Sequence, residues 1–460
     1  MTPIKKLAIG PGKLAKIQSR RELVQALGYF FVVAVAAMFL IDGGLENIVD
    51  VPSALDAVSR LTSLVGTALI LIMLLLTARI PWIDEQFGQD VATHTHKRLG
   101  KPAFYLILAH FLASLISYAM TDGRDLLAEL WYMVTTFEDF LTALISTILL
   151  IAVVVTSFKF ARKRLKYESW YLTHLLSYLM VAFAIPHVFN MGTDLVSNAI
   201  NNAIWMFAYV FVGFNILFFR VLWPIWHSTL GNLRVEKVVR ESSDSVSIYI
   251  RGRKLTRFGA QPGQFFQLRF LTRDLWQQAH PFSISAVPDD NYIRFTIGSR
   301  GDGSELMQRI KKGTRVILSG PFGVFTENVR TKKDVVLIAA GIGIPPVRAL
   351  AQGMTANPGD VSILYRTRNE ADSPLLDEIQ QLSQLRGHNL EVISGSRPTN
   401  GNWLTESNIG DEGRLLQMFP NIQDADVYVC GPENFTHQVK KSLKKLGIKK
   451  HQIHSEEYAW

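Results

Sequence analysis

Four histidines lie in or just before the long apolar segments of this chain, and they are the residues there best suited to bind a metal. His96 and His110 lie on one predicted helix, and His174 and His187 lie on a second helix of the same direction. A histidine in hydrocarbon is costly and usually marks a functional site. A single one is equally well explained by a hydrogen bond between helices, but two pairs at nearly equal spacing indicate metal ligands.

The spacing within each pair favours two stacked haem groups. The pairs are 14 and 13 positions apart, or about 20 Å along a helix axis. Imidazole is a common axial ligand of haem iron. A step of 13 positions misses the same helix face by about 140°, and we expect kinks at Pro102 and Pro186 to absorb this mismatch. His94 is expected to be a solvated loop residue, and His227 an interfacial one.

Six apolar segments are long enough to cross a membrane as helices, which takes about 17–25 residues. They run over 24–41, 61–78, 102–120, 140–158, 171–189 and 203–222. Lysine and arginine gather before the first segment and after the second and fourth, whereas the other loops are acidic. By the positive-inside rule, the N-terminus and the half after the sixth segment face the cytosol. We therefore expect a multi-pass protein of the plasma membrane, surrounded by lipid.

The charge and cysteine content exclude several classes of protein. The formal net charge is +9, but the basic residues flank the apolar segments and no nucleic-acid motif is present, so no nucleic-acid partner is expected. Cys430 is the single cysteine, which excludes an internal disulfide and a CxxC metal site. The basic N-terminus, without a small-residue cleavage site, is interpreted as a retained signal anchor.

The second half of the chain contains a segment suited to bind a flavin. It reads His280, Pro281, Phe282 and Ser283. Phe282 offers a flat face to an isoalloxazine ring, and Ser283 can hydrogen-bond to it. Backbone amides around four further residues are expected to hold a pyrophosphate, namely Gly298, Gly301, Gly303 and Ser304. The alternative is a plain barrel strand with a buried phenylalanine.

A second segment is suited to bind a dinucleotide. A buried strand at 335–340 runs into Gly341, Gly343 and Pro345, and glycines between a strand and a helix start can cradle phosphates. Three residues after neighbouring strands, Arg366, Ser396 and Arg397, are expected to bind a 2′-phosphate, which favours NADPH over NADH. The alternative for the arginines is an ordinary surface position.

These motifs together resemble the ferric reductase and NADPH oxidase superfamily over nearly the whole chain. The resemblance rests on the histidine spacing, on residues 81–100, on GIGIPP at 341–346, and on a flavin motif with His280 where many soluble ferredoxin–NADP reductases have arginine. It implies that His96 and His174 hold an inner haem, and His110 and His187 an outer one. It further implies that Cys430, Gly431 and Pro432 lie beside the nicotinamide, without a nucleophilic role for Cys430, and that Trp460 stacks on the flavin.

The predicted fold is a six-helix transmembrane bundle, followed by a β-barrel FAD-binding domain and an α/β doubly wound nucleotide-binding domain. The expected boundaries are a cytosolic segment at 1–22, a di-haem domain at 23–228, the FAD domain at 229–330 and the NADPH domain at 331–460.

The predicted function is electron transfer from cytosolic NADPH through FAD and two b-type haems to an acceptor on the outer face. Oxygen, giving superoxide, is the first choice of acceptor. The alternatives are a ferric-chelate reductase, a haem carrier serving another envelope protein, and a soluble-type reductase on an inert anchor. The paired histidines argue against the last, and the complete nucleotide half argues against the carrier. Quinone stays open as donor or acceptor, and no oligomeric state is predicted.

Overall fold

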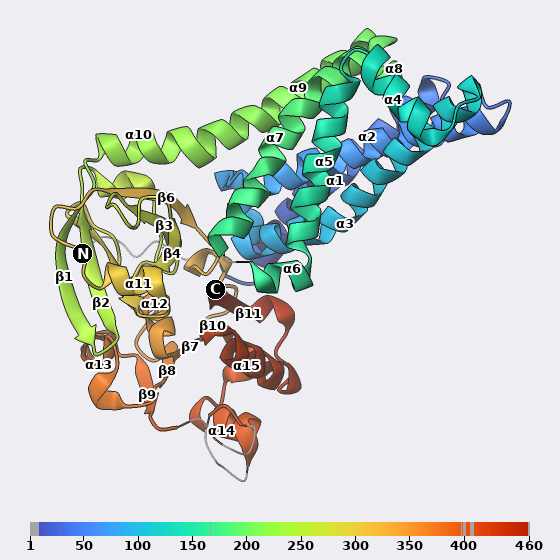
Figure 1. The fold of residues 1–460 in the computed structure, drawn as a ribbon. Coiled ribbons are helices and arrows are strands. Elements are labelled where there is room, and N and C mark those ends of the chain that lie inside the picture. Colours follow the sequence, from blue (N-terminus) through green and yellow to red (C-terminus); the bar gives the residue numbers. More distant parts are fainter. Residues whose placement is uncertain (1–8, 166, 397, 399–401, 405–408, 459–460) are drawn as a thin grey trace. The chain divides into compact units, whose positions relative to one another are not determined.

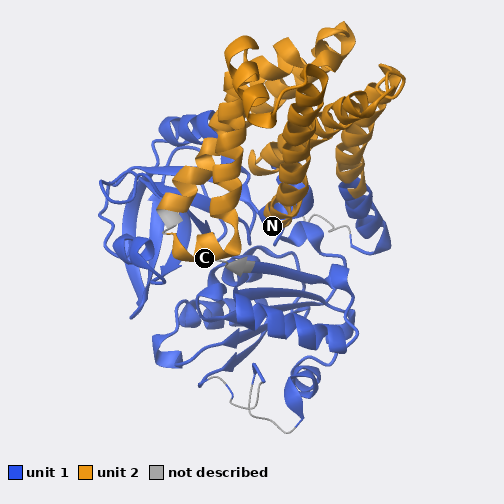
Figure 2. Cartoon of the chain, turned by 45° about the vertical axis from the view of Figure 1, so that its right-hand side comes forward, with its two compact units in different colours: residues 1–21, 81–90, 219–460 blue, residues 22–80, 91–218 orange. Residues whose placement is uncertain are grey.

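The structure is a computed structural model that describes residues 9–165, 167–396, 398, 402–404 and 409–458. Figure 1 labels its helices and strands in chain order. The chain forms two compact units, shown in different colours in Figure 2. The membrane unit comprises residues 22–80 and 91–218, and the nucleotide unit comprises residues 1–21, 81–90 and 219–460.

Within the described residues, six helical stretches are long and apolar enough to cross a membrane. They are Pro11–Ile41, Val51–Thr77, Pro81–Asp122, Phe140–Ser157, Ser169–Met191 and Ala199–Leu230. The prediction of six spans is therefore confirmed. Several of the helices begin well before the apolar segments that revealed them.

The helices of this half have the following bounds: α1 (Pro11–Ile41), α2 (Val51–Thr77), α3 (Pro81–Asp122), α4 (Leu126–Thr136), α5 (Phe140–Ser157), α6 (Lys159–Arg164), α7 (Tyr167–Met191), α8 (Thr193–Val196), α9 (Ala199–Asn215) and α10 (Trp223–Leu230). A π-helical stretch at Ile216–Leu222 joins α9 to α10.

Helix α3 carries both His96 and His110, and its interruption lies ahead of them. Gly88 has φ 73° and ψ 157°, which no helix allows, whereas Pro102 lies inside the helix without such a break. The expected kink at Pro102 therefore involves no loss of helical φ/ψ and stays a prediction. Glycine adopts a positive φ without the steric cost that a Cβ brings, and this accounts for the break at Gly88.

Polar side chains join helices of the membrane unit. Ser146 of α5 donates to the carbonyl oxygen of Met180 in α7 at 2.9 Å. Arg60 of α2 forms a two-fold ion pair with Asp194 of α8, with Nε 3.0 Å from Oδ2. Both partners are largely buried, so each charge is neutralised where water cannot solvate it.

The FAD-binding part consists of two three-stranded sheets, with strand orders β1-β2-β5 and β4-β3-β6. Their strands are β1 (Arg234–Ser242), β2 (Ser245–Arg251), β3 (Phe265–Phe270), β4 (His280–Ser283), β5 (Tyr292–Gly298) and β6 (Val316–Phe322). Isolated bridges join Arg234 to Arg315 and Ile284 to Phe295. The described sheets are small and open, so the closed barrel stays a prediction.

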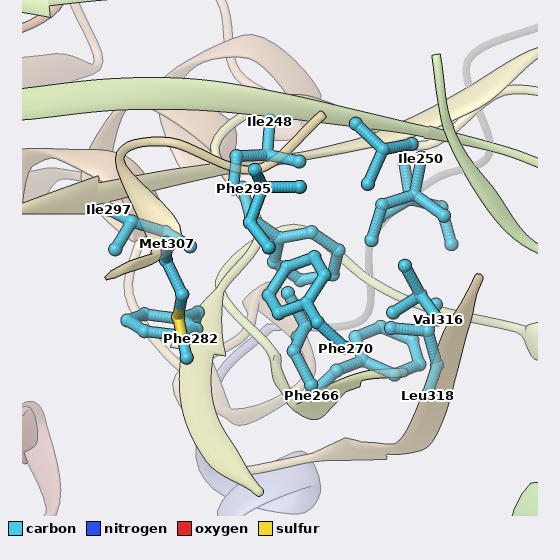
Figure 3. Close-up of a cluster of buried hydrophobic side chains, with 14 of the residues drawn as sticks. Ile248, Ile250, Phe266, Phe270, Phe282, Phe295, Ile297, Met307, Val316 and Leu318 are labelled. Carbon is cyan, nitrogen blue, oxygen red and sulfur yellow. The ribbon is translucent and has the colours of Figure 1, made fainter. Parts of the chain in front are cut away.

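The core of this part is aromatic and aliphatic. It includes Phe266, Phe270, Phe282 and Phe295, all shown in Figure 3. Strand β3 alternates buried and half-buried residues along its length, as a strand with one core-facing side should.

The nucleotide-binding part is a parallel five-stranded sheet of order β11-β10-β7-β8-β9. The strands are β7 (Val335–Ala340), β8 (Val361–Arg366), β9 (Asn389–Ile393), β10 (Asp426–Pro432) and β11 (Ile453–Tyr458), and the helices are α12 (Ile344–Gly353), α13 (Leu376–Arg386), α14 (Gly410–Met418) and α15 (Glu433–Lys445). One face packs on α12 and α13, and the other packs on α14 and α15. The sheet is therefore doubly wound, as predicted.

Candidate functional site

The histidines of α3 and α7 form two pairs in the membrane unit. The ring centroids of His96 and His174 are 6.0 Å apart, and those of His110 and His187 are 6.2 Å apart. With metal–nitrogen bonds of about 2 Å and about 1.1 Å from ring nitrogen to ring centre, two imidazoles on opposite sides of one ion have centroids about 6 Å apart. Both pairs thus have the spacing of two axial ligands of one metal ion.

Neighbouring helices bind the Nδ1 atoms of three of these rings. Nδ1 of His96 lies 3.1 Å from the carbonyl oxygen of Met73, and Nδ1 of His110 lies 3.1 Å from that of Ser59. Nδ1 of His174 lies 3.2 Å from the hydroxyl of Ser157. A ring that donates from Nδ1 keeps its lone pair on Nε2, which is the arrangement that fixes a histidine as a ligand.

The surroundings of the two pairs differ. Trp170 stacks on His174 with ring centroids 5.2 Å apart and an interplanar angle of 29°. His110 and His187 line a cavity of about 200 Å³ together with Ser59, Arg60 and further residues of the membrane unit. Nδ1 of His187 is buried and has no hydrogen-bond partner among the described residues. Such an orphaned polar atom is costly in an apolar interior, so water or a ligand group is expected beside it.

In the nucleotide unit, the predicted flavin segment forms strand β4. Phe282 is only 6% exposed and belongs to the core of the sheets, with the ring of His280 stacked on it at 6.3 Å and 23°. Nε2 of His280 lies 2.9 Å from the amide oxygen of Gln278. Burial lowers the pKa of His280. This histidine is therefore neutral near pH 7 and does not supply the charge of an arginine.

The predicted pyrophosphate loop follows strand β5. Ser304 accepts from the amide of Arg300 at 2.8 Å and donates to the carbonyl oxygen of Gly301, so its hydroxyl serves the loop itself. The amide of Ser299 already donates to Asp244 at 2.7 Å. A Cβ on Gly303 would lie 2.8 Å from the His280 ring, which explains the glycine and places this loop against strand β4.

The glycines after strand β7 pack against both neighbouring motifs. A Cβ on Gly298 would lie 2.9 Å from Ile342. The end of strand β5 therefore touches the loop Gly341–Gly343 after β7, which we call the phosphate loop. A Cβ on Gly343 would lie 2.3 Å from the carbonyl oxygen of Cys430. Gly341 has φ 51°, and Pro345 is buried in the first turn of α12. The structure thus brings the predicted flavin and nucleotide residues together at the carboxyl ends of the parallel strands, where such sheets bind ligands.

Cys430 and Gly431 end strand β10 beside the last strand of the chain. Cys430 is fully buried, and a Cβ on Gly431 would lie 2.9 Å from Phe435. Pro432 is exposed at the start of α15. The parallel register pairs Cys430 with Glu456, so strand β11 ends beside this motif. Trp460 lies outside the described residues, as does Arg397.

Arg366 lies in the interior of the nucleotide-binding part and not on its surface. It is 9% exposed, and its guanidinium donates to the carbonyl oxygens of Gly395 at 2.9 Å and Ser396 at 2.7 Å. The surface-position alternative disagrees with this burial, whereas binding of a 2′-phosphate by Arg366 stays a prediction. Arg366 holds the loop that carries Ser396.

Two carboxyl groups at the site were not found from the sequence. Glu456 is buried and accepts a hydrogen bond from the Ser283 hydroxyl at 3.2 Å. Asp84, at the start of α3 and within the nucleotide unit, accepts from the amide of Gly323 at 2.9 Å. Both lie far in sequence from the residues they contact, so only the tertiary fold reveals them.

The remaining predicted histidines lie as follows. His94 is exposed, as expected, but it lies within helix α3 and not in a loop, so that part of the prediction is wrong. His227 is half-buried against Trp223, with ring centroids 4.0 Å apart. Among the described residues, no group of three or more histidine, cysteine or acidic side chains is placed to hold a metal ion. Any ion held by the paired histidines therefore needs further ligands from outside the chain.

Comparison with known protein families assigns three domains. Residues 62–185 match the ferric reductase like transmembrane component, residues 232–326 match an FAD-binding domain, and residues 337–441 match an oxidoreductase NAD-binding domain. This combination of domains matches a ferric reductase or NADPH oxidase-type fusion with a ferredoxin–NADP reductase-like module. The second half of the chain thus joins an FAD-binding domain to the NAD-binding domain of an NAD(P)H-dependent oxidoreductase.

Curated relatives resemble the second half of the chain. A flavohemoprotein of Pseudomonas putida is 29% identical over 233 residues, which cover 49% of this chain and 58% of that protein. The ferredoxin reductase component of a 3-ketosteroid-9-alpha-monooxygenase from Rhodococcus rhodochrous is 26% identical and is covered to 64%. The chain therefore spans less than two thirds of the length of these relatives.

Among solved structures, the FAD/NAD-binding domain of a nitric oxide dioxygenase from Vibrio cholerae is 23% identical. It matches 49% of this chain and 97% of its own length with a TM-score of 0.40.

Proposed function

We propose that this protein carries electrons from NADPH on the cytosolic side, through FAD and two b-type haems, to an acceptor on the outer face. The observation that carries the proposal is the pairing of His96 with His174 and of His110 with His187 at 6.0 and 6.2 Å. The cytosolic placement of the nucleotide unit follows from the basic loops after the second and fourth spans.

The donor set fits haem better than a bare metal ion. Each pair supplies two imidazoles, and the described residues offer no third protein ligand beside them. A porphyrin supplies the other four ligands of a six-coordinate iron, and histidine is a usual axial ligand. His96 and His174 would hold the inner haem, and His110 and His187 the outer one. With both axial positions filled by histidine, the iron has no open site for a substrate.

The residues of the nucleotide unit fit FAD and a nicotinamide nucleotide. Strand β4 and the loop Gly301–Ser304 would hold the FAD, with the two three-stranded sheets acting as one barrel linked by their isolated bridges. Gly341, Gly343 and the start of α12 would hold the nucleotide phosphates. FAD held there would supply the conversion of a two-electron hydride donor into single electrons, and haem held by the histidine pairs would supply one-electron transfer across the membrane.

The chain's own residues keep this chemistry positioned and shielded. Gly298 allows the end of strand β5 to approach the phosphate loop, and Gly343 allows that loop to approach the end of β10. The Ser283–Glu456 hydrogen bond holds a buried carboxyl group beside the flavin strand, and burial raises the pKa of Glu456 well above its ordinary value. We propose that Trp460, which follows strand β11, covers the flavin until the nicotinamide displaces it.

Oxygen, giving superoxide, is our proposed acceptor, and a ferric chelate is the second candidate. NADPH-driven superoxide production by the purified protein in detergent, with FAD and haem content verified, tests the choice. His187→Leu is the control, since free flavin also reduces oxygen. Superoxide that disappears in His187→Leu supports the oxidase, whereas superoxide that persists in this variant, or is absent from the wild type, excludes it and favours the ferric chelate.

A further inference from the structure

An ion cluster of two largely buried arginines and the half-buried Glu378, whose side chain is 36% exposed, joins the FAD-binding and NAD-binding domains inside the nucleotide unit. Arg294 of strand β5 contacts Glu378 of α13 through both guanidinium nitrogens, at 2.7 and 2.9 Å. Arg348 of α12 contacts the same carboxylate at 3.0 Å. The Arg294 side chain is 4% exposed and that of Arg348 is 13% exposed. One carboxylate therefore faces two largely buried cations from different domains, and the three groups together keep a formal charge of +1.

The same side chains also hold the backbone just after the flavin strand. Arg294 donates to the Ser285 carbonyl oxygen at 2.7 Å and to its hydroxyl at 3.0 Å. Arg348 donates to the same carbonyl oxygen at 3.3 Å. Gln352, one turn further along α12, hydrogen-bonds to Arg348 and accepts from the amide of Val287 at 2.9 Å. Segment 285–287 is thus fixed from both domains.

The position of the cluster connects it to both nucleotide sites. Ser285 lies two residues beyond Ser283, which ends strand β4. Arg348 lies about one helical turn beyond Gly343, where the phosphate loop ends and α12 begins. Because a helix moves as a rigid element, any shift of α12 at Arg348 also moves the phosphate loop. The distance between the flavin strand and that loop is therefore tied to this cluster.

We propose that Glu378 is a positioning residue that clamps the two domains together and so sets the geometry of hydride transfer. The inference rests on the proposed use of FAD and a nicotinamide nucleotide. Glu378 does not touch either cofactor site itself; it acts through Arg294 and Arg348. Without its charge, the two guanidinium groups repel each other across the domain boundary, and a buried charge is left uncompensated.

The test measures, by rapid mixing, how fast NADPH reduces the bound FAD of the Glu378→Gln variant. We expect the rate constant at saturating NADPH to fall by about tenfold to a hundredfold, because a misplacement of about 1 Å can cost about a hundredfold. The KM for NADPH should change less than the rate constant. Glu412→Gln is the matched control, since its ion pair with Lys445 at 2.9 Å lies within the NAD-binding domain, and it should keep the wild-type rate.

A second readout needs no nucleotide. Hydrogen exchange of the Val287 amide should be faster in Glu378→Gln than in the wild type, because the Gln352 acceptor on α12 is no longer held in place. A purely structural role would lower thermal stability and FAD retention but leave the rate constant per bound FAD unchanged. Wild-type values of both the rate constant and the exchange would overturn the clamp.

A further variant covers the case in which Glu378→Gln loses its FAD. Arg348→Met leaves the Arg294–Glu378 pair balanced and removes only the arm from α12, so slower flavin reduction and faster Val287 exchange are expected. Wild-type behaviour of Arg348→Met would then overturn the proposal. If the wild-type protein itself does not reduce its FAD with NADPH or NADH, the proposed function fails, and the Val287 exchange still tests the clamp.

Discussion

Gly343 lies against the end of strand β10 with no room for a side chain, so alanine at this position should disturb the nucleotide site. A Cβ would lie 2.3 Å from the carbonyl oxygen of Cys430 and 2.6 Å from its carbonyl carbon. Non-bonded heavy atoms pack at about 3.5 Å, so the phosphate loop or the end of β10 must move by about 1 Å. Both neighbours are backbone, and no flexible side chain can yield instead.

A displacement of this size has a predictable effect on hydride transfer. Misplacement of reacting groups by about 1 Å can cost about a hundredfold in rate, which corresponds to about 2.7 kcal/mol of activation free energy. We therefore expect Gly343→Ala to lower the rate constant for reduction of bound FAD by NADPH by about a hundredfold. The assay is anaerobic rapid mixing of the FAD-loaded protein with saturating NADPH, with the flavin absorbance as the signal.

Gly341→Ala is the contrasting variant in the same loop. A Cβ on Gly341 meets nothing within 4 Å, but its φ of 51° is unfavourable for alanine by about 1–2 kcal/mol. This variant should lose stability yet reduce its flavin faster than Gly343→Ala does. A Gly343→Ala protein with the wild-type rate constant and the wild-type KM for NADPH would refute the reasoning.

Two further predictions concern Glu456 and Arg366. Burial, with the nearby Asp90, raises the pKa of Glu456 well above 4.5. At a pH between 4.5 and the raised pKa, the folded protein holds a proton that the unfolded chain has lost. The stability of the folded protein therefore falls as pH rises through this range. Glu456→Gln should therefore show a smaller drop in Tm from about pH 5 to about pH 8 than the wild type; an equal drop would contradict the assignment. Arg366→Met should raise the KM for NADPH by about tenfold, as expected for loss of hydrogen bonds from a charged group, and raise that for NADH less, because the loop carrying Ser396 loses its anchor. Equal increases for both nucleotides in steady-state kinetics would show that the loop does not bind the 2′-phosphate.

The parts of the fold that followed from the sequence are those with a local pattern. Strand β3 alternates core and half-buried residues, and strand β7 is apolar throughout, so the bounds of both could be predicted to the residue. The six spans follow from segment length and composition alone. The glycines after β7 indicated a phosphate loop, because the turn between a strand and a helix has few other solutions.

Features that depend on tertiary packing could not be predicted in this way. The break in α3 at Gly88 lies outside the apolar segment that revealed this helix. No local pattern in the sequence indicates that the helix breaks at Gly88. Arg366 reads as a surface cation until the loop carbonyl oxygens around it are known. Glu456 and Glu378 lie in segments with no motif, and their partners Ser283 and Arg294 are 173 and 84 positions away.

The histidine pairs lie between these two cases. Their residue types and spacing predicted metal ligands, but a step of 13 positions on an ideal helix points to another face. The structure nevertheless places His187 beside His110 and His174 beside His96. Pairing therefore had to come from the packed helices rather than from periodicity.

The central claim, that electrons cross the membrane through the two histidine pairs, is tested most directly in proteoliposomes. NADPH is added outside vesicles whose protein exposes the nucleotide unit outward, and reduction of a membrane-impermeant electron acceptor trapped inside is measured. We predict that the trapped acceptor is reduced by the wild type, and that His187→Leu abolishes this reduction while NADPH still reduces the bound FAD. Equal reduction of the trapped acceptor by His187→Leu would contradict the account.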